Sequence, residues 1–417
     1  MLMILLTAWP AITLASRNEQ PQDRDQRWLQ DIEFFAKQFP ALQMDADKLI
    51  PPAKFRSEIK AIEDDIPHLS DSEIVLRLMH LVASAGVGHD GVLWTSGQYS
   101  LHRYPLRFTW FSDGPAVTSA AAEYELAVGA RVLRIGTMTP QEFESAAASY
   151  YPYENLSRLR AQGPVLMMTR EIATHFGLAA SDGSVDITLA KPGEGPFHVR
   201  VAPAATGQEM HLISWAQAHQ LPEPIYRRNL GSNYWYQYLP EAKTLYIQYT
   251  VCAEDPKKPF KDFVDEIFRF VDSKMDSGGV GRVIVDLRLN GGGSDGVIKP
   301  LLNALEARPT LVAKGHLFVL MSGNTFSSGM SAVFALRDEF HAVLIGEPVG
   351  ERPNTYGDVK TLTLPNSGIK VAYTAKYFRF LKDSDPPSLD PDLPVQRSIA
   401  DLLINRDPVL DAALNYH

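Results

Sequence analysis

Residues 283–293 read VIVDLRLNGGG, in which the apolar run VIVDL continues into three consecutive glycines. A short continuous run of β-branched residues is typical of a strand that is buried on both faces, as in parallel sheets. Consecutive glycines leave backbone N–H groups open to whatever lies above them, because no Cβ shields them. The stretch therefore predicts a buried strand that ends in a glycine segment, which is either a loop of backbone donors or a flexible turn.

The sequence around this stretch alternates strand-like and helix-like patterns. Enrichment in β-branched and aromatic residues predicts three more strands, at 244–249, 317–321 and 342–345. Pro259 opens an amphipathic helix between the first two predicted strands, and further helical patterns separate the others. Such alternation is typical of βαβ units in a mainly parallel sheet, whose sites lie at the carboxyl ends of the strands. We therefore expect a layered α/β core over residues 234–417.

The N-terminal half has a different organisation. Residues 20–95 have a helical pattern, and Ser70 and Glu73 have the spacing of a capping box. Residues 101–205 alternate short apolar runs with Gly and Pro turns, with a helix expected after Thr139-Pro140, and 206–233 form a connection. Because single cores stop growing well below 417 residues, we expect two or three domains.

Composition excludes several classes of protein. The net charge of −9 is spread along the chain without a basic stripe, so we expect no nucleic-acid partner. Cys252 is the only cysteine, which excludes a disulfide framework and a CxxC metal pair. The histidines have no HExxH spacing, so we expect no metal and no cofactor.

Residues 1–16 form an apolar run that ends in small residues, with Thr13 and Ala15 in the pattern of a cleavage site. They predict a signal peptide and export to the periplasm or the extracellular space. The first basic residue is Arg17, after the apolar run, so a mis-assigned start or a short uncleaved anchor are the alternatives. No later stretch has the eighteen or so apolar residues of a spanning helix, so we expect no stable membrane insertion.

One serine and one histidine are candidates for nucleophilic catalysis. Ser327, in the segment NTFSSG at 324–329, lies between a predicted strand and a predicted helix, where the helix dipole stabilises developing negative charge. The alternative is that Ser327 or Ser328 only caps the helix. His89 has glycines on both sides, which places it in a loop where it can serve as a base.

Five segments, taken together and in order, resemble the tail-specific or C-terminal processing serine peptidases, in particular their tricorn-core branch. They are residues 86–91, 285–293, 325–329, 345–350 and 389–393. The resemblance implies a core similar to the ClpP and crotonase folds and a PDZ-like domain at 101–205. It also implies that Ser327 is the nucleophile and that backbone N–H groups of Gly291, Gly292 and Ser328 form the oxyanion hole.

The chain departs from the family in the residues that would activate the serine. The bacterial processing enzymes use a lysine shortly after a Gly-Glu-Pro-type turn, where this chain has Glu351-Arg352. The tricorn-like branch instead pairs its serine with a histidine from the N-terminal side, which fits His89, and orients it with a serine and an acid. Gly88 stands where that serine would be. For the acid we expect Asp385, with Asp390 next, although both are also readable as solvated loop carboxylates.

The sequence thus predicts a serine-type peptidase that hydrolyses unfolded proteins or peptides through an acyl-enzyme. A second hypothesis is a catalytically inactive protein that binds a hydrophobic small molecule or peptide on the same fold, supported by the missing lysine and serine. A third is an esterase, which the absence of a Gly-x-Ser-x-Gly elbow disfavours. The oligomeric state does not follow from the sequence.

Overall fold

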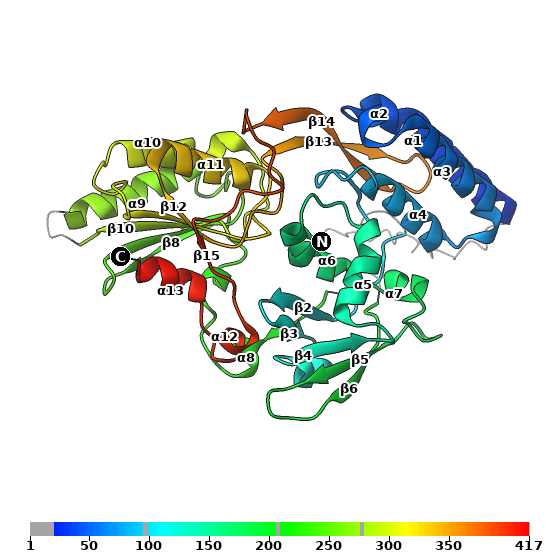
Figure 1. The fold of residues 1–417 in the computed structure, drawn as a ribbon, viewed down its shortest axis with the longest axis horizontal. Helices are drawn as coiled ribbons and strands as arrows, with labels where there is room; N and C mark the ends of the chain where they lie inside the picture. Colours follow the sequence, from blue (N-terminus) through cyan, green and yellow to red (C-terminus); the bar gives the residue numbers. More distant parts are fainter. Residues whose placement is uncertain (1–20, 95–98, 206–208, 276–278, 417) are drawn as a thin grey trace, which may run out of the picture.

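The computed structural model describes residues 21–94, 99–205, 209–275 and 279–416. The predicted signal peptide at 1–16 lies outside the described residues. The chain folds into three sheets with helices packed around them, which confirms the mixed α/β class (Figure 1). No helix in the described ranges has the length and apolar character that crossing a membrane requires.

The central sheet contains the stretch VIVDL and is mainly parallel, as predicted. Its order is β15 (Leu393–Pro394), β12 (Val343–Gly346), β11 (Leu317–Met321), β10 (Arg282–Asp286), β9 (Thr244–Tyr249) and β8 (Tyr234–Leu239), and only β8 is antiparallel to its neighbour. Side chains alternate between two buried faces: Val285 packs on the helical layer and Ile284 on the opposite face. The helical layer is α9 (Phe260–Met275), α10 (Lys299–Glu306) and α11 (Ser328–Phe340), and the opposite face is covered by α13 (Pro408–Leu414).

The middle region forms an antiparallel sheet. Its order is β2 (Leu106–Phe111), β3 (Gly114–Ala120), β4 (Arg131–Ile135), β5 (Val185–Ala190) and β6 (Phe197–Val201). The helices of this region are α5 (Pro140–Ala147), α6 (Leu156–Met167) and α7 (Arg170–His175). Thr139 and Glu142 form a capping box, so α5 begins where the Thr-Pro pair predicted a helix. The predicted connection contains β7 (Ile213–Ser214), which pairs with β3, and α8 (Trp215–Ala218).

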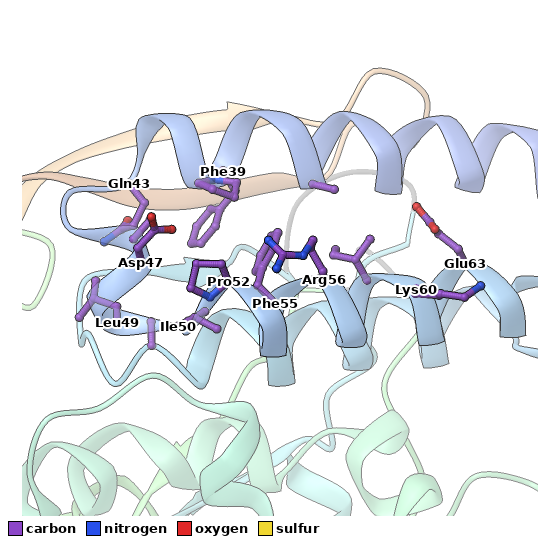
Figure 2. Close-up of a pocket in the computed structure, with 15 residues that line it drawn as sticks. Phe39, Gln43, Asp47, Leu49, Ile50, Pro52, Phe55, Arg56, Lys60 and Glu63 are labelled. Carbon is purple, nitrogen blue, oxygen red and sulfur yellow. The ribbon is translucent and has the colours of Figure 1, made fainter.

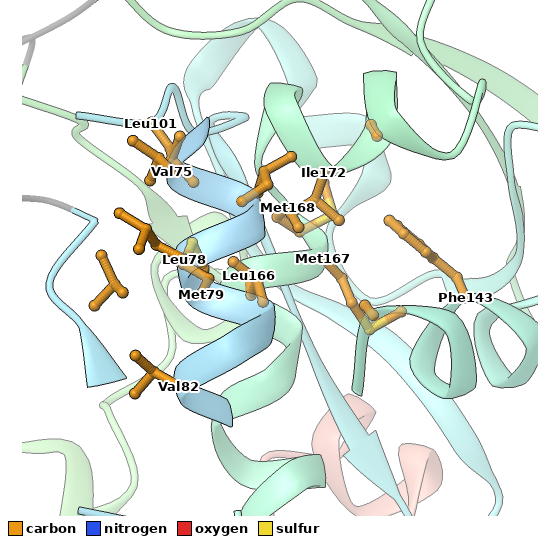
Figure 3. Packing of buried hydrophobic residues seen from close by; sticks show 14 of the residues in the cluster. Val75, Leu78, Met79, Val82, Leu101, Phe143, Leu166, Met167, Met168 and Ile172 are labelled. Atoms are coloured by element: carbon orange, nitrogen blue, oxygen red, sulfur yellow. The ribbon is translucent and has the colours of Figure 1, made fainter. Parts of the chain in front are cut away.

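The N-terminal helices are α1 (Pro21–Leu42), α2 (Ala46–Leu49), α3 (Pro52–Asp65) and α4 (Asp71–Ala83). The predicted capping box of Ser70 and Glu73 begins α4. The apolar face of α4 packs against α6 and α7, so the N-terminal helices and the middle region share one core (Figure 3). Near the C-terminus, α12 (Ile399–Leu403) packs on the middle sheet through Ile399 and Leu402. Short 3₁₀ helices lie at 66–68, 122–127, 148–150, 225–227 and 295–298.

A long hairpin from the C-terminal half of the chain packs against the N-terminal region. The sequence patterns did not predict this hairpin. It consists of β13 (Asn354–Thr363) and β14 (Lys370–Arg379), and it leaves the central layer to lie beside the N-terminal helices (Figure 1). β14 pairs with β1 (Gly91–Val92), and the Gln43 side chain donates to the Thr374 hydroxyl at 2.8 Å. The loop that carries His89 is thereby anchored to the C-terminal half.

Candidate active site

The loops that follow β10 and β11 are tied together at the carboxyl edge of the central sheet. The Thr325 hydroxyl donates to the Leu287 carbonyl at 2.8 Å, and the Phe326 N–H donates to the Asn290 carbonyl at 3.0 Å. Beneath them, the buried Arg288 guanidinium forms ion pairs with Asp286 at 2.5 Å and Asp407 at 2.7 Å. The loop at 290–293, here called the glycine loop, and the loop at 322–327, here called the serine loop, are therefore held together as one unit.

Ser327 lies on a strained turn directly before α11. Its φ of 56° and ψ of −131° are unusual for a residue with a Cβ, and such strain costs on the order of 1–3 kcal/mol. The Ser327 N–H donates to Glu351 Oε1 at 2.7 Å. A Cβ on Gly292 would stand 2.5 Å from the Cβ of Ser327, so only glycine allows this close approach. Strain that the surroundings impose in this way is typical of a nucleophile held out toward a cleft.

His89 lies in the loop between α4 and β1 and faces the same cavity as Ser327. Its side chain is 6% exposed, and its ring lies over Phe326 with 4.3 Å between the ring centroids. The Nδ1 atom is 3.5 Å from Glu351 Oε2. Within the described part of the chain, neither ring nitrogen makes a hydrogen bond, so Ser327 and His89 share the cavity without a direct bond between them.

Two glutamates, neither predicted from the sequence, hold this arrangement: Glu351 is buried and Glu154 is partly buried. Glu351 accepts the Ser327 N–H through Oε1, and its Oε2 faces the His89 ring, 3.5 Å from Nδ1, without a hydrogen bond. Glu154 accepts hydrogen bonds from the Gly88 N–H at 3.1 Å and the Arg352 N–H at 2.8 Å, so it fastens the histidine loop to the Glu351 loop. The signal for Glu351 was its place after the Gly-Glu-Pro turn, where a lysine base was sought. Glu154 belongs to no motif.

Burial sets the protonation of these groups. Burial, assisted by the positive charge of Arg158, lowers the pKa of His89 to about 4, so the imidazole is neutral at neutral pH. Burial and the nearby charge of Glu154 raise the pKa of Glu351 well above its usual range. Burial also raises the pKa of the adjacent Asp90 to about 7. A neutral imidazole is the form that accepts a proton from a hydroxyl.

The two aspartates that were expected to orient His89 lie elsewhere. Asp385 is 54% exposed and pairs with the Arg352 guanidinium at 2.7 Å, and it does not line the cavity that holds Ser327. Asp390 is also exposed and accepts a hydrogen bond from the Ser388 hydroxyl at 2.6 Å. The carboxylate that the structure brings to His89 is that of Glu351.

The expected oxyanion donors differ in their availability. Gly291 and Ser328 line the cavity, and the Ser328 hydroxyl donates to the Gly293 carbonyl at 3.0 Å, which holds the glycine loop in place. The Gly292 N–H donates to Asn290 Oδ1 at 2.9 Å. In this conformation the Gly292 N–H is bonded to Asn290 and does not point to an oxyanion. The role of Gly292 is to leave room for Ser327, because it has no side chain.

The cavity has a volume of about 660 Å³ and is walled on one side by the β13–β14 hairpin. Val359, Phe378 and Phe380 from the hairpin expose apolar surface there, and the ion pair of Asp358 with Lys376 lies beside them. Among the described residues, no group of three or more His, Cys, Asp or Glu side chains is arranged to hold a metal ion.

A separate cavity of about 450 Å³ lies in the N-terminal helical region, between α1 and α3 (Figure 2). Its wall is mainly apolar, with Phe39, Ile50 and Phe55 on its inner side. Among the described residues, no serine, cysteine or histidine lines this cavity.

Comparison with known proteins agrees with this description at the level of the fold. No protein-family model and no curated protein sequence matches the chain. Mature CPAF complexed with lactacystin superposes with a TM-score of 0.64 at 12% identity, covering 94% of this chain and 99% of that chain. Mature CPAF gives a TM-score of 0.63 at 13% identity, covering 94% and 98%.

The photosystem II D1 C-terminal processing protease is a more distant match, with a TM-score of 0.42 at 12% identity over 89% of this chain and 93% of that chain. The chain therefore has the fold of mature CPAF.

Proposed function

We propose that the chain is a serine-type peptidase in which Ser327 is the nucleophile and His89 is the general base. One observation carries the proposal: a single cavity gathers a serine on a strained turn at a helix N-terminus, a buried neutral imidazole and a glycine loop. These are the three parts that acyl transfer requires.

Each residue has a role in the proposed reaction. His89 takes the proton of the Ser327 hydroxyl as Oγ attacks the peptide carbonyl, after its ring has moved from Phe326 toward Oγ. The His89 proton then passes to the leaving amine as the C–N bond breaks, and water hydrolyses the acyl-enzyme by the reverse sequence. Glu351, and not Asp385, lies on the Nδ1 side of the imidazole, and it stabilises the charged ring when its own carboxyl group is ionised.

The oxyanion would be held by backbone N–H groups of Ser328 and Gly291. Both residues line the cavity, and Ser328 stands at the first turn of α11, where the helix dipole favours negative charge. Gly292 joins them only if Asn290 releases its N–H. The exposed apolar wall of Phe378 and Phe380 suits the side chains of an unfolded protein or peptide.

We propose the finer features of the fold on the same basis. The central layer is a ClpP/crotonase-like catalytic core over 234–417, and the middle sheet is a PDZ-like domain over 101–205, preceded by a helical domain over 20–95. Residues 206–233 connect them. Export to the periplasm or the extracellular space is proposed from the pattern of residues 1–16 alone.

Hydrolysis of unfolded casein and of a peptide library tests the proposal, together with labelling by a fluorophosphonate probe. We expect Ser327→Ala and His89→Ala to lose cleavage and labelling. Ser328→Ala, which keeps its backbone N–H, should retain most of the rate. Loss in the first two with labelling at Ser327 would establish the nucleophile and its base.

Absence of turnover and of labelling in the folded protein would contradict the proposal. The inactive binding protein would then be the better description, because its serine would have no base in reach. Cleavage of esters but not of peptides would point to an esterase.

A further inference from the structure

A second cleft reaches the glycine loop from the side of the middle sheet. It has a volume of about 470 Å³ and lies between strand β2, helix α6 and the loops at Gly291 and Asn324. Four arginines line it, Arg103, Arg107, Arg158 and Arg227, and none of its lining residues in the described part of the chain is acidic. Gly291 lines this cleft and also the cavity of Ser327, so the two spaces meet at the glycine loop.

The positive charge of this arginine cleft is poorly balanced. Arg227 has a carboxylate partner in Glu223 at 3.4 Å. In the described ranges, Arg103 and Arg107 have no carboxylate within 4 Å. Burial, and then repulsion by Arg103 and Arg227, lowers the pKa of Arg107. A concave surface with several like charges and few counterions concentrates ligands of the opposite charge.

Arg158 links the arginine cleft to the catalytic centre. Its guanidinium lies 4.0 Å from the ring centroid of Phe326, the residue before Ser327. Its Nε atom is buried and makes no hydrogen bond within the described part of the chain. A negative group in the cleft would therefore meet a cation that stands next to the nucleophile.

The arginine cleft is also fixed in position relative to Ser327. At the N-terminus of α6, the Asn155 side chain donates to the Val349 and Pro387 carbonyls, each at 3.0 Å. Further along the helix, the Gln162 amide donates to Asn324 Oδ1 at 2.5 Å. Helix α6 is therefore hydrogen-bonded to the loop that follows β11 and carries Ser327.

The shape and lining of the cleft favour a peptide over a small anion. Strand β2 is the edge strand of its sheet, and its residues Leu106 and Phe108 line the cleft. Val165, which is 40% exposed, adds apolar surface, and the buried Met168 also lines the cleft. A site with both apolar and cationic surface beside an edge strand suits an extended chain that carries acidic side chains.

We propose that the arginine cleft binds acidic side chains of the peptide substrate, on one side of the bond that Ser327 attacks. The proposal rests on the peptidase function proposed above, and it adds a substrate class: segments rich in Asp or Glu. The substrate crosses Gly291 between the two spaces.

Binding of a fluorescein-labelled glutamate-rich peptide to the Ser327→Ala variant, measured by fluorescence anisotropy, tests this without turnover. The comparison peptide has glutamine at every glutamate position. We expect the combined Arg103→Gln and Arg107→Gln substitutions to raise the Kd of the acidic peptide at least about tenfold, since a charged hydrogen-bond partner is lost at each site. Arg56→Gln removes the same charge from α3 and should leave the Kd unchanged.

Equal binding of the glutamine peptide, or an unchanged Kd in the double arginine variant, would overturn the inference. So would a peptide whose binding is lost on amidation of its C-terminus but kept when its glutamates are replaced, because the carboxyl terminus would then be the ligand. Thermal unfolding of each variant checks that it is folded.

Cleavage assays with Ser327 intact separate the two proposals. Binding of the acidic peptide without hydrolysis of any peptide would refute the peptidase function and leave the cleft assignment standing. Hydrolysis with no preference between the acidic and the glutamine peptide would support the peptidase function and refute the assignment of the arginine cleft.

Discussion

Replacing Gly292 with alanine should inactivate the protein without unfolding it. The new Cβ would lie 2.5 Å from the Cβ of Ser327 and 3.0 Å from its Oγ, at a backbone φ of 108° that side chains rarely adopt. Carbon atoms in contact normally keep about 3.5–4.0 Å apart, so the serine or the glycine loop has to move by roughly 1 Å. Backbone strain adds on the order of 1–3 kcal/mol.

A displacement of about 1 Å at a reacting centre typically costs on the order of a hundredfold in rate. We therefore expect kcat/KM for a cleaved peptide to fall about a hundredfold, and fluorophosphonate labelling to slow in parallel. The measurement is steady-state hydrolysis beside thermal unfolding, which reports the strain as a modest fall in Tm.

Gly296→Ala is the matched control, because a Cβ at that exposed position meets no atom within 4 Å and Gly296 does not line the cavity of Ser327. It should retain activity within about threefold, since an exposed substitution of this kind changes little. A folded Gly292→Ala protein with normal activity would refute the idea that the close approach of the glycine loop positions Ser327.

Four further outcomes are expected. Glu351→Gln should lower kcat for a cleaved peptide at least about a hundredfold. Asp385→Asn, at an exposed ion pair, should keep kcat within about twofold of the wild-type value. Equal effects of the two substitutions would contradict the assignment of Glu351, and not Asp385, as the acid beside His89. The acid limb of kcat/KM should follow the pKa of His89, about 4, so a limb near pH 6.5 in the pH profile would be inconsistent with a buried base. The pKa of Asp90 is raised to about 7, so its contribution to stability is present below its unfolded pKa of 3.8 and is lost as pH rises through 7. Asp90→Asn should therefore raise stability by ~2 kcal/mol at about pH 8 and little at about pH 4, measured as Tm. Ser327→Gly should be more stable than Ser327→Ala by ~1 kcal/mol in denaturant unfolding, because glycine relieves the strain at φ 56°, and equal stability would argue against that strain.

Much of the fold follows from local patterns in the sequence. The strands of the central sheet are continuous apolar runs, and α4 and α5 begin at capping boxes that a few neighbouring residues specify. The β13–β14 hairpin escaped prediction because its partners are remote: Ala372 pairs with Gly91, and the Asp31 carboxylate binds the turn at Ser367. Its outer half is exposed, so the hairpin lacks a simple apolar period.

The candidate site was predictable where chemistry and loop residues coincide in one segment. Ser327 follows a strand, His89 lies between glycines, and both line one cavity. Glu351 and Glu154 were missed because a single glutamate in a loop has no period. What makes them important is burial between segments that are distant in sequence. Asp385 was chosen for its pattern near the chain end, but the Arg352 guanidinium holds it at the surface.

The strand that follows His89, β1, pairs with β14, and β14 is synthesised after both His89 and Ser327. During synthesis, Ser327 leaves the ribosome before residues 354–379 do, and without them nothing pairs with the strand that follows His89. A nascent chain therefore carries a nucleophile whose base is not yet held in place. For a peptidase, this order of assembly delays cleavage until residues 354–379 have been synthesised and have paired with β1.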